Sequence, residues 1–271
     1  MDTNPQPEPS RTTRTSAKTT ANNSSELPMA SKSKRRVHLV LQGKGGVGKT
    51  LVALMLAQYL TEAGSPIRSY DTDPVNSSFA AITALAARPI DLLEGEQINS
   101  LEIDRLVNEW IGGEGDVIVD NGAAGFVPMS KYLIENEVSE VLAAHGMEMV
   151  IHTIVAGGGS MLDTLRGLAS VIQNYPPAVK LVVWANEYFG PLRAEGIDFE
   201  DTKVYRENRE RIGGIVRLAK LNPHHGRNVL EMLDQKLTFT EVIDRPDTMV
   251  IAKQRLTMVK RDIFSQIAAV V

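Results

Sequence analysis

The segment from residue 43 to residue 50 constrains the fold of this chain more than any other. It reads GKGGVGKT, which matches G-x-x-x-x-G-K-[ST], and it lies between a short apolar run at 37–42 and a helical apolar pattern at 50–64. Glycines in such a loop let consecutive backbone N–H groups turn toward phosphate oxygens, and the following helix N-terminus adds its dipole. The segment therefore predicts a strand, a phosphate-binding loop and a helix.

The rest of the chain alternates between short apolar runs and helical patterns. Further strands are expected at 67–71, 116–120, 149–155, 180–186 and 214–219. Helices are expected around 100–111, 129–144, 160–173 and 201–212, with more helix toward the end. This alternation is typical of an α/β fold in which a mostly parallel sheet carries helices on both faces. We expect one such domain over residues 36–271.

The first 35 residues have a different composition. They are rich in Pro, Ser, Thr and Asn and have few large apolar side chains, so burial cannot offset the entropy lost on ordering. We expect residues 1–35 to be a disordered tail, and translation from Met29 instead of Met1 would remove most of it. Residues 1–36 carry a surplus of four positive charges, and because the whole chain carries −4, the remainder carries −8. An acidic body argues against nucleic-acid binding over the whole surface, but leaves room for a local basic patch.

Composition also excludes several kinds of chemistry. The chain has no cysteine, which rules out disulfides, cysteine nucleophiles, iron–sulfur clusters and thiolate zinc sites. No apolar run approaches the ~18 residues of a membrane-spanning helix, and the N-terminus lacks the apolar core of a signal peptide. We expect a soluble cytoplasmic protein, and peripheral contact with the inner membrane stays open.

Three polar side chains are candidates for contact with phosphate and metal. Lys49 can reach the outer phosphates, and the Thr50 hydroxyl can ligate Mg²⁺. Asp120 ends the apolar run DVIVD, where a carboxylate can hold Mg²⁺ through a water molecule. Asp-Asn-Gly would by itself suit an ordinary turn. Beside the phosphate loop, we interpret Asp120 as part of a metal site.

Two further aspartates follow the strand expected at 67–71. Asp71 and Asp73 lie in the stretch YDTDPVNSS, and they would emerge at the carboxyl edge of the sheet, beside the phosphate loop. Ligands bind at this edge in open α/β folds. Asp-Pro also suits a plain turn, but we interpret this stretch as catalytic.

The chain resembles the deviant Walker A ATPases of the ParA/MinD family. The resemblance rests on KGGVGKT, on DTDP after the second strand and on DVIVDNGAAG. It implies a P-loop NTPase that binds ATP and Mg²⁺ and forms a homodimer on ATP binding. It also implies that the extra lysine, Lys44, crosses to the nucleotide of the partner subunit, much as an arginine finger does. A solvated loop lysine is the simpler alternative.

The same resemblance gives roles to other residues. Asp73 would orient the attacking water, Asp71 would lie near the metal, and Asn186 would recognise the adenine amino group. An Asn at a strand-to-loop turn is a nearly equal alternative for Asn186. The segment DNGAAGF lacks the prolines that are common at this place in the family. This departure does not affect the metal role of Asp120. The residues implied to bind nucleotide are Gly43, Lys44, Gly45, Gly46, Val47, Gly48, Lys49, Thr50, Leu51 and Asn186.

A closer likeness is to plasmid conjugal transfer proteins. It covers roughly residues 36–271 and includes FVPMSKYL and WANEYFGP, which are not generic ATPase motifs. It implies an accessory ATPase of conjugation that acts through other conjugative-transfer proteins. The alternatives are a plasmid partition or positioning ATPase that binds DNA nonspecifically, and a module that binds ATP but hardly cleaves it. The absence of cysteine excludes the metal-cluster carriers of the wider family.

The C-terminal stretch has apolar side chains at helical spacing with basic residues nearby. The apolar residues are Leu256, Val259, Ile263, Ile267 and Val270, and the basic residues are Lys253, Arg255, Lys260 and Arg261. Relatives use such a helix on membranes, or basic residues on DNA. We favour a final helix packed on the sheet with a solvated basic edge. The segment PHHGRN, at 223–228, is interpreted as a loop.

Overall fold

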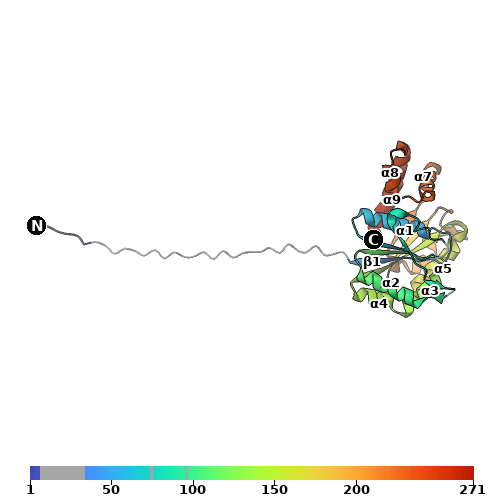
Figure 1. Cartoon of the computed structure of the whole chain (residues 1–271), viewed down its shortest axis with the longest axis horizontal. Helices are drawn as coiled ribbons and strands as arrows, with labels where there is room; N and C mark the ends of the chain where they lie inside the picture. The colour runs from blue at the N-terminus through green and yellow to red at the C-terminus, as the bar shows by residue number, and fades with distance from the viewer. Residues whose placement is uncertain (7–33, 74–75, 96) are drawn as a thin grey trace. The chain divides into compact units, whose positions relative to one another are not determined.

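In the computed structural model, a seven-stranded parallel sheet runs through the compact unit that follows residue 33 (Figure 1). The structure describes residues 1–6, 34–73, 76–95 and 97–271, so the tail expected at 1–35 falls mostly outside the described residues. Residues Lys34–Val271 form one compact unit. The strand order is β11-β8-β7-β1-β6-β2-β3. The strands are β1 (Arg35–Val40), β2 (Ile67–Asp71), β3 (Arg88–Pro89), β6 (Asp116–Asp120), β7 (Met147–Ala156), β8 (Lys180–Asn186) and β11 (Gly214–Leu218).

Helices cover both faces of this sheet (Figure 1). One face carries α1 (Lys49–Glu62), α7 (Pro223–Asp234), α8 (Phe239–Asp244) and α9 (Val250–Val270). The other carries α2 (Ser100–Gly112), α3 (Phe126–Glu135), α4 (Val138–Ala144), α5 (Met161–Asn174) and α6 (Lys203–Glu207). Each face has its own apolar cluster, anchored by fully buried Trp184 on the first face and fully buried Trp110 on the second. The predicted fold class is confirmed.

Shorter elements complete the chain. Two antiparallel hairpins pair β4 (Leu93–Glu94) with β5 (Gln97–Ile98) and β9 (Arg193–Ala194) with β10 (Ile197–Asp198). Single 3₁₀ turns lie at Thr83–Leu85, Gly158–Ser160, Phe199–Asp201 and Arg209–Arg211. Strands of two residues are too short to give a period-two pattern, so none of these hairpins, nor β3, was predicted.

Three expected elements are wrong in detail. The helix expected at 129–144 is two helices, because the chain turns at Glu137, which has a left-handed φ of 47°. The helix expected at 201–212 is only α6 followed by a 3₁₀ turn. The segment PHHGRN is not a loop but the start of α7, since the Asn222 side chain caps the helix and Pro223 suits its first turn.

The last helix packs as expected. Leu256, Val259, Ile263 and Ile267 of α9 are buried in the apolar cluster that α9 shares with the sheet and α1, and Ala252 is also buried. Lys260 forms an ion pair with Glu62 of α1, so part of the basic edge is used within the chain. In the described part of the chain, no helix has both the length and the apolar character to cross a bilayer.

Hydrogen bonds link two histidines and a tryptophan inside the core. The Trp184 indole N–H donates to Nδ1 of His152 (3.0 Å), so Nε2 of His152 carries the proton that faces Nδ1 of His38 (2.9 Å). Both rings are fully buried. Burial lowers the pKa of His38 from 6.5 to about 3, and it lowers the pKa of His152 well below 6.5. Both rings are therefore neutral at neutral pH.

These buried histidines predict that the folded protein loses stability in acid. Because the folded-state pKa values lie below the unfolded value, their contribution to stability is complete above about pH 6.5 and is lost as the pH falls toward 3. We expect each histidine to steepen the fall in unfolding free energy by up to about 1.4 kcal/mol per pH unit. In the His38→Leu variant, the slope of unfolding free energy against pH should be smaller by one such increment. At pH 7 this variant should be less stable than wild type by about 1–3 kcal/mol, because the His152 N–H loses its acceptor.

Urea denaturation between pH 4.5 and 7.5 measures both effects. The His145→Leu variant, which replaces an exposed histidine, is the matched control. Identical slopes for wild type and His38→Leu would show that the buried pair is not the source of the acid sensitivity.

Candidate functional site

The glycine loop joins β1 to α1 at the carboxyl edge of the sheet. Gly46 and Gly48 have φ values of 73° and 104°, which side chains with a Cβ rarely adopt. Gly48 is the N-cap of α1, and no described side chain caps that helix end. The first N–H groups of α1 are therefore available to an anion, which the helix dipole also favours.

Lys49 folds back into this loop. Its side chain is 8% exposed, and Nζ donates to the carbonyl oxygen of Lys44 (3.2 Å). Burial lowers the pKa of Lys49, while the carboxylates of Asp120 and Asp73 act in the opposite direction. The ammonium group thus lies at the Lys44 carbonyl and near two acidic side chains, at the place where phosphate charge would be received.

Thr50 and Asp120 lie in direct contact below the loop. The Thr50 hydroxyl donates to Oδ2 of Asp120 (2.6 Å), and Oδ1 of Asp120 has no hydrogen-bond partner among the described residues although it is buried. Burial, with Asp71 and Asp73 nearby, raises the pKa of Asp120 to about 7 against the opposing effects of Thr50 and Lys49. A buried carboxylate oxygen without a partner indicates that a donor or a cation belongs there.

These two groups suit Mg²⁺. The ion prefers oxygen ligands and is usually held by one or two carboxylates together with substrate phosphates and water. Over the described ranges, no set of three or more His, Cys, Asp or Glu residues forms a ready-made metal cage. Thr50 and Asp120 would therefore supply the protein ligands, and the remaining ligands would come from a bound phosphate group and water.

Asp71 and Asp73 lie beside Asp120, as their strand positions require. Asp71 is paired in register with Asp120 across β2 and β6, and it is 1% exposed. Its carboxylate accepts three backbone N–H groups, from Asp73 (3.1 Å), Phe79 (2.9 Å) and Ala80 (3.0 Å). These bonds show that Asp71 organises the segment after β2.

Asp73 reaches the segment after β6. Its carboxyl carbon is so close to Gly122 that an added Cβ there would lie 2.9 Å from it. Asp73 also accepts from the backbone N–H of Asn76 (3.0 Å). The segments that follow β2 and β6 therefore touch each other next to the glycine loop, and the three predicted aspartates come together at one edge.

Lys44 is directed toward α5. Its Nζ lies 2.9 Å from Oδ2 of Asp163, and both side chains are 42% exposed. The Lys44 ammonium lowers the pKa of Asp163, and Arg166 also contacts this carboxylate. Half-exposed ion pairs contribute little to stability, so Lys44 can exchange this partner for another at small cost. Asp163 was not predicted, because nothing in its local sequence signals the contact.

Asn186 ties the end of β8 to the glycine loop. Its side-chain NH₂ donates to the carbonyl oxygen of Val47 (3.0 Å), and its carbonyl oxygen accepts from the backbone N–H of Tyr188 (3.0 Å). The residue is 3% exposed. The structure thus brings Asn186 into the candidate site, where its visible contacts hold backbone in place.

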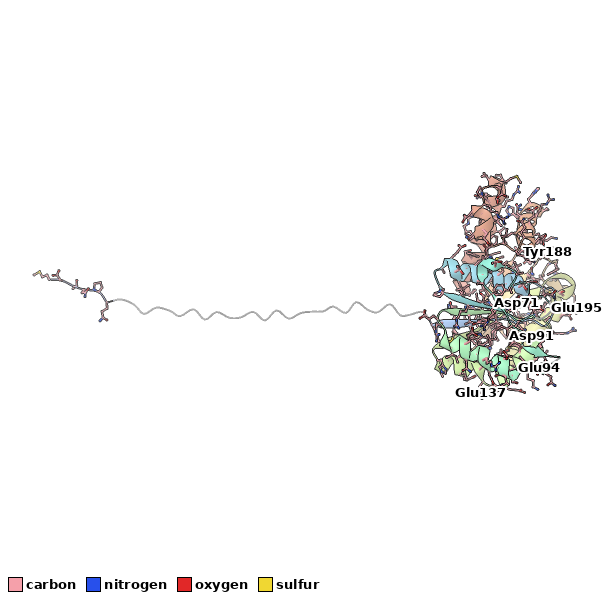
Figure 2. The ribbon with its side chains drawn as sticks, in the orientation of Figure 1. Asp71, Asp91, Glu94, Glu137, Tyr188 and Glu195 are labelled. Carbon is pink, nitrogen blue, oxygen red and sulfur yellow. The ribbon has the colours of Figure 1, made fainter. Side chains whose placement is uncertain are left out.

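A cavity of about 930 Å³ begins at the glycine loop. Its walls come from Gly46 and Gly48, from α1, from the segment after β8, and from the β11–α7 connection with α7 and α9. Tyr188, which lines it, lies toward the foot of α7 (Figure 2). The cavity is mostly apolar and offers room for a heterocyclic base next to the phosphate loop.

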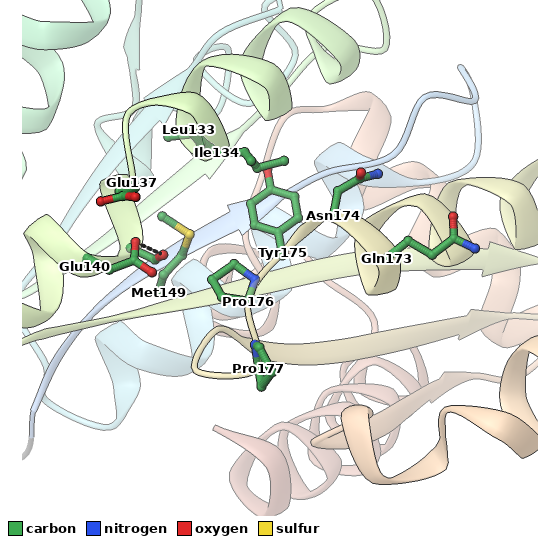
Figure 3. Close-up of a pocket in the computed structure, with 11 residues that line it drawn as sticks. Leu133, Ile134, Glu137, Glu140, Met149, Gln173, Asn174, Tyr175, Pro176 and Pro177 are labelled. Atoms are coloured by element: carbon green, nitrogen blue, oxygen red, sulfur yellow. Dashed lines mark hydrogen bonds between the residues drawn. The ribbon is translucent and has the colours of Figure 1, made fainter.

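A second cavity lies apart from this edge. It has a volume of about 360 Å³ and is formed by α3, α4, the start of β7 and the end of α5, with Tyr175 at its centre (Figure 3). None of the predicted site residues lines it. Of the predicted site residues, Gly46, Gly48, Leu51 and Asn186 line the larger cavity.

The buried carboxylate gives a test of the candidate metal site. Since the folded-state pKa of Asp120 exceeds its usual 3.8, this group lowers the unfolding free energy progressively as the pH rises from about 4 to about 7. We expect Asp120→Asn to stabilise the ligand-free protein at pH 8 by about 1–3 kcal/mol, and to remove any stabilisation by Mg²⁺ with nucleotide.

Thermal and urea unfolding at pH 5 and pH 8 measure this change. Asp247→Asn, at an exposed position, removes the same charge without burial and is the matched control. A destabilised Asp120→Asn protein at pH 8 would contradict the assignment of an unfavourable buried charge.

Comparison with known proteins places this site in a family. Residues 38–222 match the CobQ/CobB/MinD/ParA nucleotide binding domain. Two Escherichia coli proteins named TraL are each 41% identical to the chain, over 86% of its length and over 98% and 97% of theirs. The chromosome-partitioning ATPase Soj of Thermus thermophilus is 40% identical over 25% of the chain and 27% of its own.

Among solved structures, the MinC:MinD cell division protein complex of Aquifex aeolicus matches with a TM-score of 0.48 and 15% identity, over 85% of this chain and 96% of that chain. The match over residues 38–222 and the two TraL relatives show that the chain belongs to the CobQ/CobB/MinD/ParA family of nucleotide-binding domains and, within it, to the group of the TraL proteins.

Proposed function

We propose that the protein binds Mg·ATP, forms a homodimer around it and hydrolyses it slowly, as an accessory ATPase of plasmid conjugal transfer. The observation that carries this proposal is the contact between Thr50 and Asp120 beneath an uncapped helix N-terminus. A glycine loop alone binds an anion, whereas the buried carboxylate beside it adds a place for the cation that accompanies a nucleoside triphosphate.

The predicted residues around the phosphates and the metal have the following places in this proposal. Residues 43–51 receive the triphosphate, and Lys49 exchanges its contact with the Lys44 carbonyl for the outer phosphates. Thr50 and Asp120 hold Mg²⁺, which when bound would neutralise charge on the phosphates. Asp71 positions the neighbouring segment close to the metal, and Asp73 orients the attacking water.

Lys44 acts on the second copy in this proposal. Its ammonium group points to α5 and is partly exposed, and the backbone of the same loop contacts Lys49. One copy therefore has a cation that is available at its surface, next to its own nucleotide loop. We assign it to the triphosphate of the partner subunit, where it would stabilise charge from outside the pocket.

The biological role rests on the TraL relatives. The chain spans nearly their whole length, and the likeness to conjugal transfer proteins extends to segments outside the phosphate site. On this basis the partners are other conjugative-transfer proteins in the cytoplasm. The competing candidate is a partition ATPase that binds DNA nonspecifically, which the shorter match to Soj favours. The apolar stripe of α9 is packed in the core, so the proposal does not include binding of that stripe to a membrane.

The two loop lysines give opposite predictions. Lys49→Ala should abolish ATP binding, because the triphosphate loses the ammonium group inside its own loop. Lys44→Ala should retain binding but lose ATP-dependent dimerisation and turnover, since its partner is the other subunit. Calorimetry with Mg·ATP, sedimentation velocity and phosphate release distinguish the two variants. Arg166→Ala, which removes the other cation at Asp163, is the control and should keep both activities. Equal turnover in wild type and Lys44→Ala would refute the role in trans.

Asp73 gives a separate test of hydrolysis. Asp73→Ala should form a long-lived ATP-bound dimer, visible by light scattering, because binding is retained and the attacking water is no longer oriented. An unchanged monomer–dimer balance in ATP would count against this assignment.

The same trapped dimer separates the two biological roles. We expect it to stay in the supernatant when it is sedimented with plasmid DNA at physiological salt. Co-sedimentation that requires ATP would favour the partition ATPase instead.

A further inference from the structure

The smaller cavity, of about 360 Å³, lies at the edge of the sheet where β7 and β8 begin (Figure 3). This is the edge opposite the glycine loop, which follows the carboxyl end of β1 in the same parallel sheet. The lining includes the apolar side chains of Leu133, Ile134 and Met149. The volume falls within the range of ~300–1,000 Å³ that is typical of ligand pockets. No residue of the proposed nucleotide site lines this cavity, so its ligand would be a separate one.

Two carboxylates line this cavity without an ion-pair partner among the described residues. They belong to Glu137 and Glu140, which are both exposed. The Ser139 hydroxyl donates to Oε2 of Glu140 (2.7 Å) and restrains it. Glu140 also favours the dipole at the start of α4, but the side chain of Glu137, the N-cap residue, makes no capping hydrogen bond. Helix capping therefore does not account for the charge of Glu137 at the cavity.

Tyr175 lies at the centre of the lining residues, with the hydroxyl end of its ring beside Ile134 (Figure 3). The residue is 5% exposed, and burial raises the pKa of its hydroxyl to about 12, so the group stays protonated. It lies near the buried hydroxyl of Ser130. Neither oxygen forms a hydrogen bond of normal geometry with a described residue. A buried hydroxyl without a partner indicates that the cavity is incomplete without a ligand.

The wall that carries Tyr175 is held rigidly from behind. The guanidinium group of Arg211 donates to four carbonyl oxygens, those of Tyr175 (3.3 Å), Pro176 (3.2 Å), Pro177 (3.1 Å) and Val179 (3.2 Å). Two consecutive prolines restrict the backbone further. A wall that is fixed before binding reduces the entropy lost when a ligand is taken up.

An arginine side chain combines the properties that this lining calls for. Its guanidinium group donates in a planar fork that suits carboxylates, and it also stacks on aromatic rings. Its aliphatic stem packs on apolar surface. A free arginine would bring an α-carboxylate as well, but the described lining contains no lysine, arginine or histidine to receive it. An arginine within a polypeptide lacks that charge, because its α-groups are part of amides.

We propose that this cavity binds an arginine side chain of a partner polypeptide, with its guanidinium group at Glu137 and Glu140 and its stem along Tyr175. The charge of the site carries the choice of occupant, since two uncompensated carboxylates repel an acidic partner and attract a basic one. Arginine is also among the residues most often responsible for affinity at protein interfaces. This partner site lies at the opposite edge of the sheet from the nucleotide site.

Methyl NMR of the full chain tests the proposal, because Met149 lies in the lining and reports on it directly. The ten methionines are labelled with ¹³C at their methyl groups, and Met149→Leu assigns the signal. N-acetyl-arginine amide at low ionic strength should shift the Met149 signal saturably. The exposed Met249, which lines neither cavity, should not shift. N-acetyl-citrulline amide, which has nearly the same shape without the charge, should leave Met149 unshifted.

Removal of the two charges gives the second part of the test. Glu137→Gln combined with Glu140→Gln should raise the Kd for N-acetyl-arginine amide roughly 2- to 25-fold, because each exposed ion pair contributes modestly. Glu135→Gln removes an exposed carboxylate of α3 outside the lining, and this matched control should stay within about twofold of wild type. Free arginine should bind more weakly than the blocked compound, since its carboxylate meets two others.

An unshifted Met149 signal at millimolar N-acetyl-arginine amide would overturn the proposal, and so would equal shifts with the citrulline compound. An unchanged Kd in the double variant would overturn it as well, because the carboxylates would not be the recognition groups. Equal affinity for free arginine would overturn the assignment to a polypeptide. The protein is free of nucleotide in every measurement, so none of these results decides the proposed function.

Discussion

The parallel pairing of β1 with its two neighbours is the constraint on which the rest of the structure depends. Because β1, β2 and β6 run in the same direction, the glycine loop and the acidic residues at their carboxyl ends meet at one edge. Register then places Asp71 opposite Asp120, and α1 starts directly after the loop. Backbone pairing thus assembles side chains that are far apart in the sequence.

The assembled site is electrostatically costly, and this cost is informative. Asp120 lies in the core with one oxygen that has no hydrogen-bond partner among the described residues. Lys49 donates to the Lys44 carbonyl, and burial lowers its pKa. Native proteins seldom leave such groups unsatisfied unless a ligand completes them. Mg²⁺ with a triphosphate would satisfy the carboxylate, the lysine and the free N–H groups of α1 at once.

Much of this architecture could be predicted from the sequence, and physical reasons explain why the rest could not. Strongly apolar runs such as DVIVD and the GKGGVGKT loop specify their own conformation, so the sheet and the site edge could be predicted. Contacts that cross the fold have no local signal. Lys44 with Asp163, Asn186 with Val47 and His38 with His152 each join segments more than 100 residues apart. The start of α7 was missed because Asn222 and Pro223 suit both a turn and a helix cap.

The central claim is that backbone amides at this strand-to-helix corner hold the phosphates. Hydrogen–deuterium exchange of the full chain tests it most directly, because it reports on the N–H groups themselves. The account predicts slower exchange in the peptide that contains residues 45–50 on addition of Mg·ATP or Mg·tripolyphosphate, and no change with adenosine. Unchanged exchange in that peptide at millimolar Mg·ATP would contradict it.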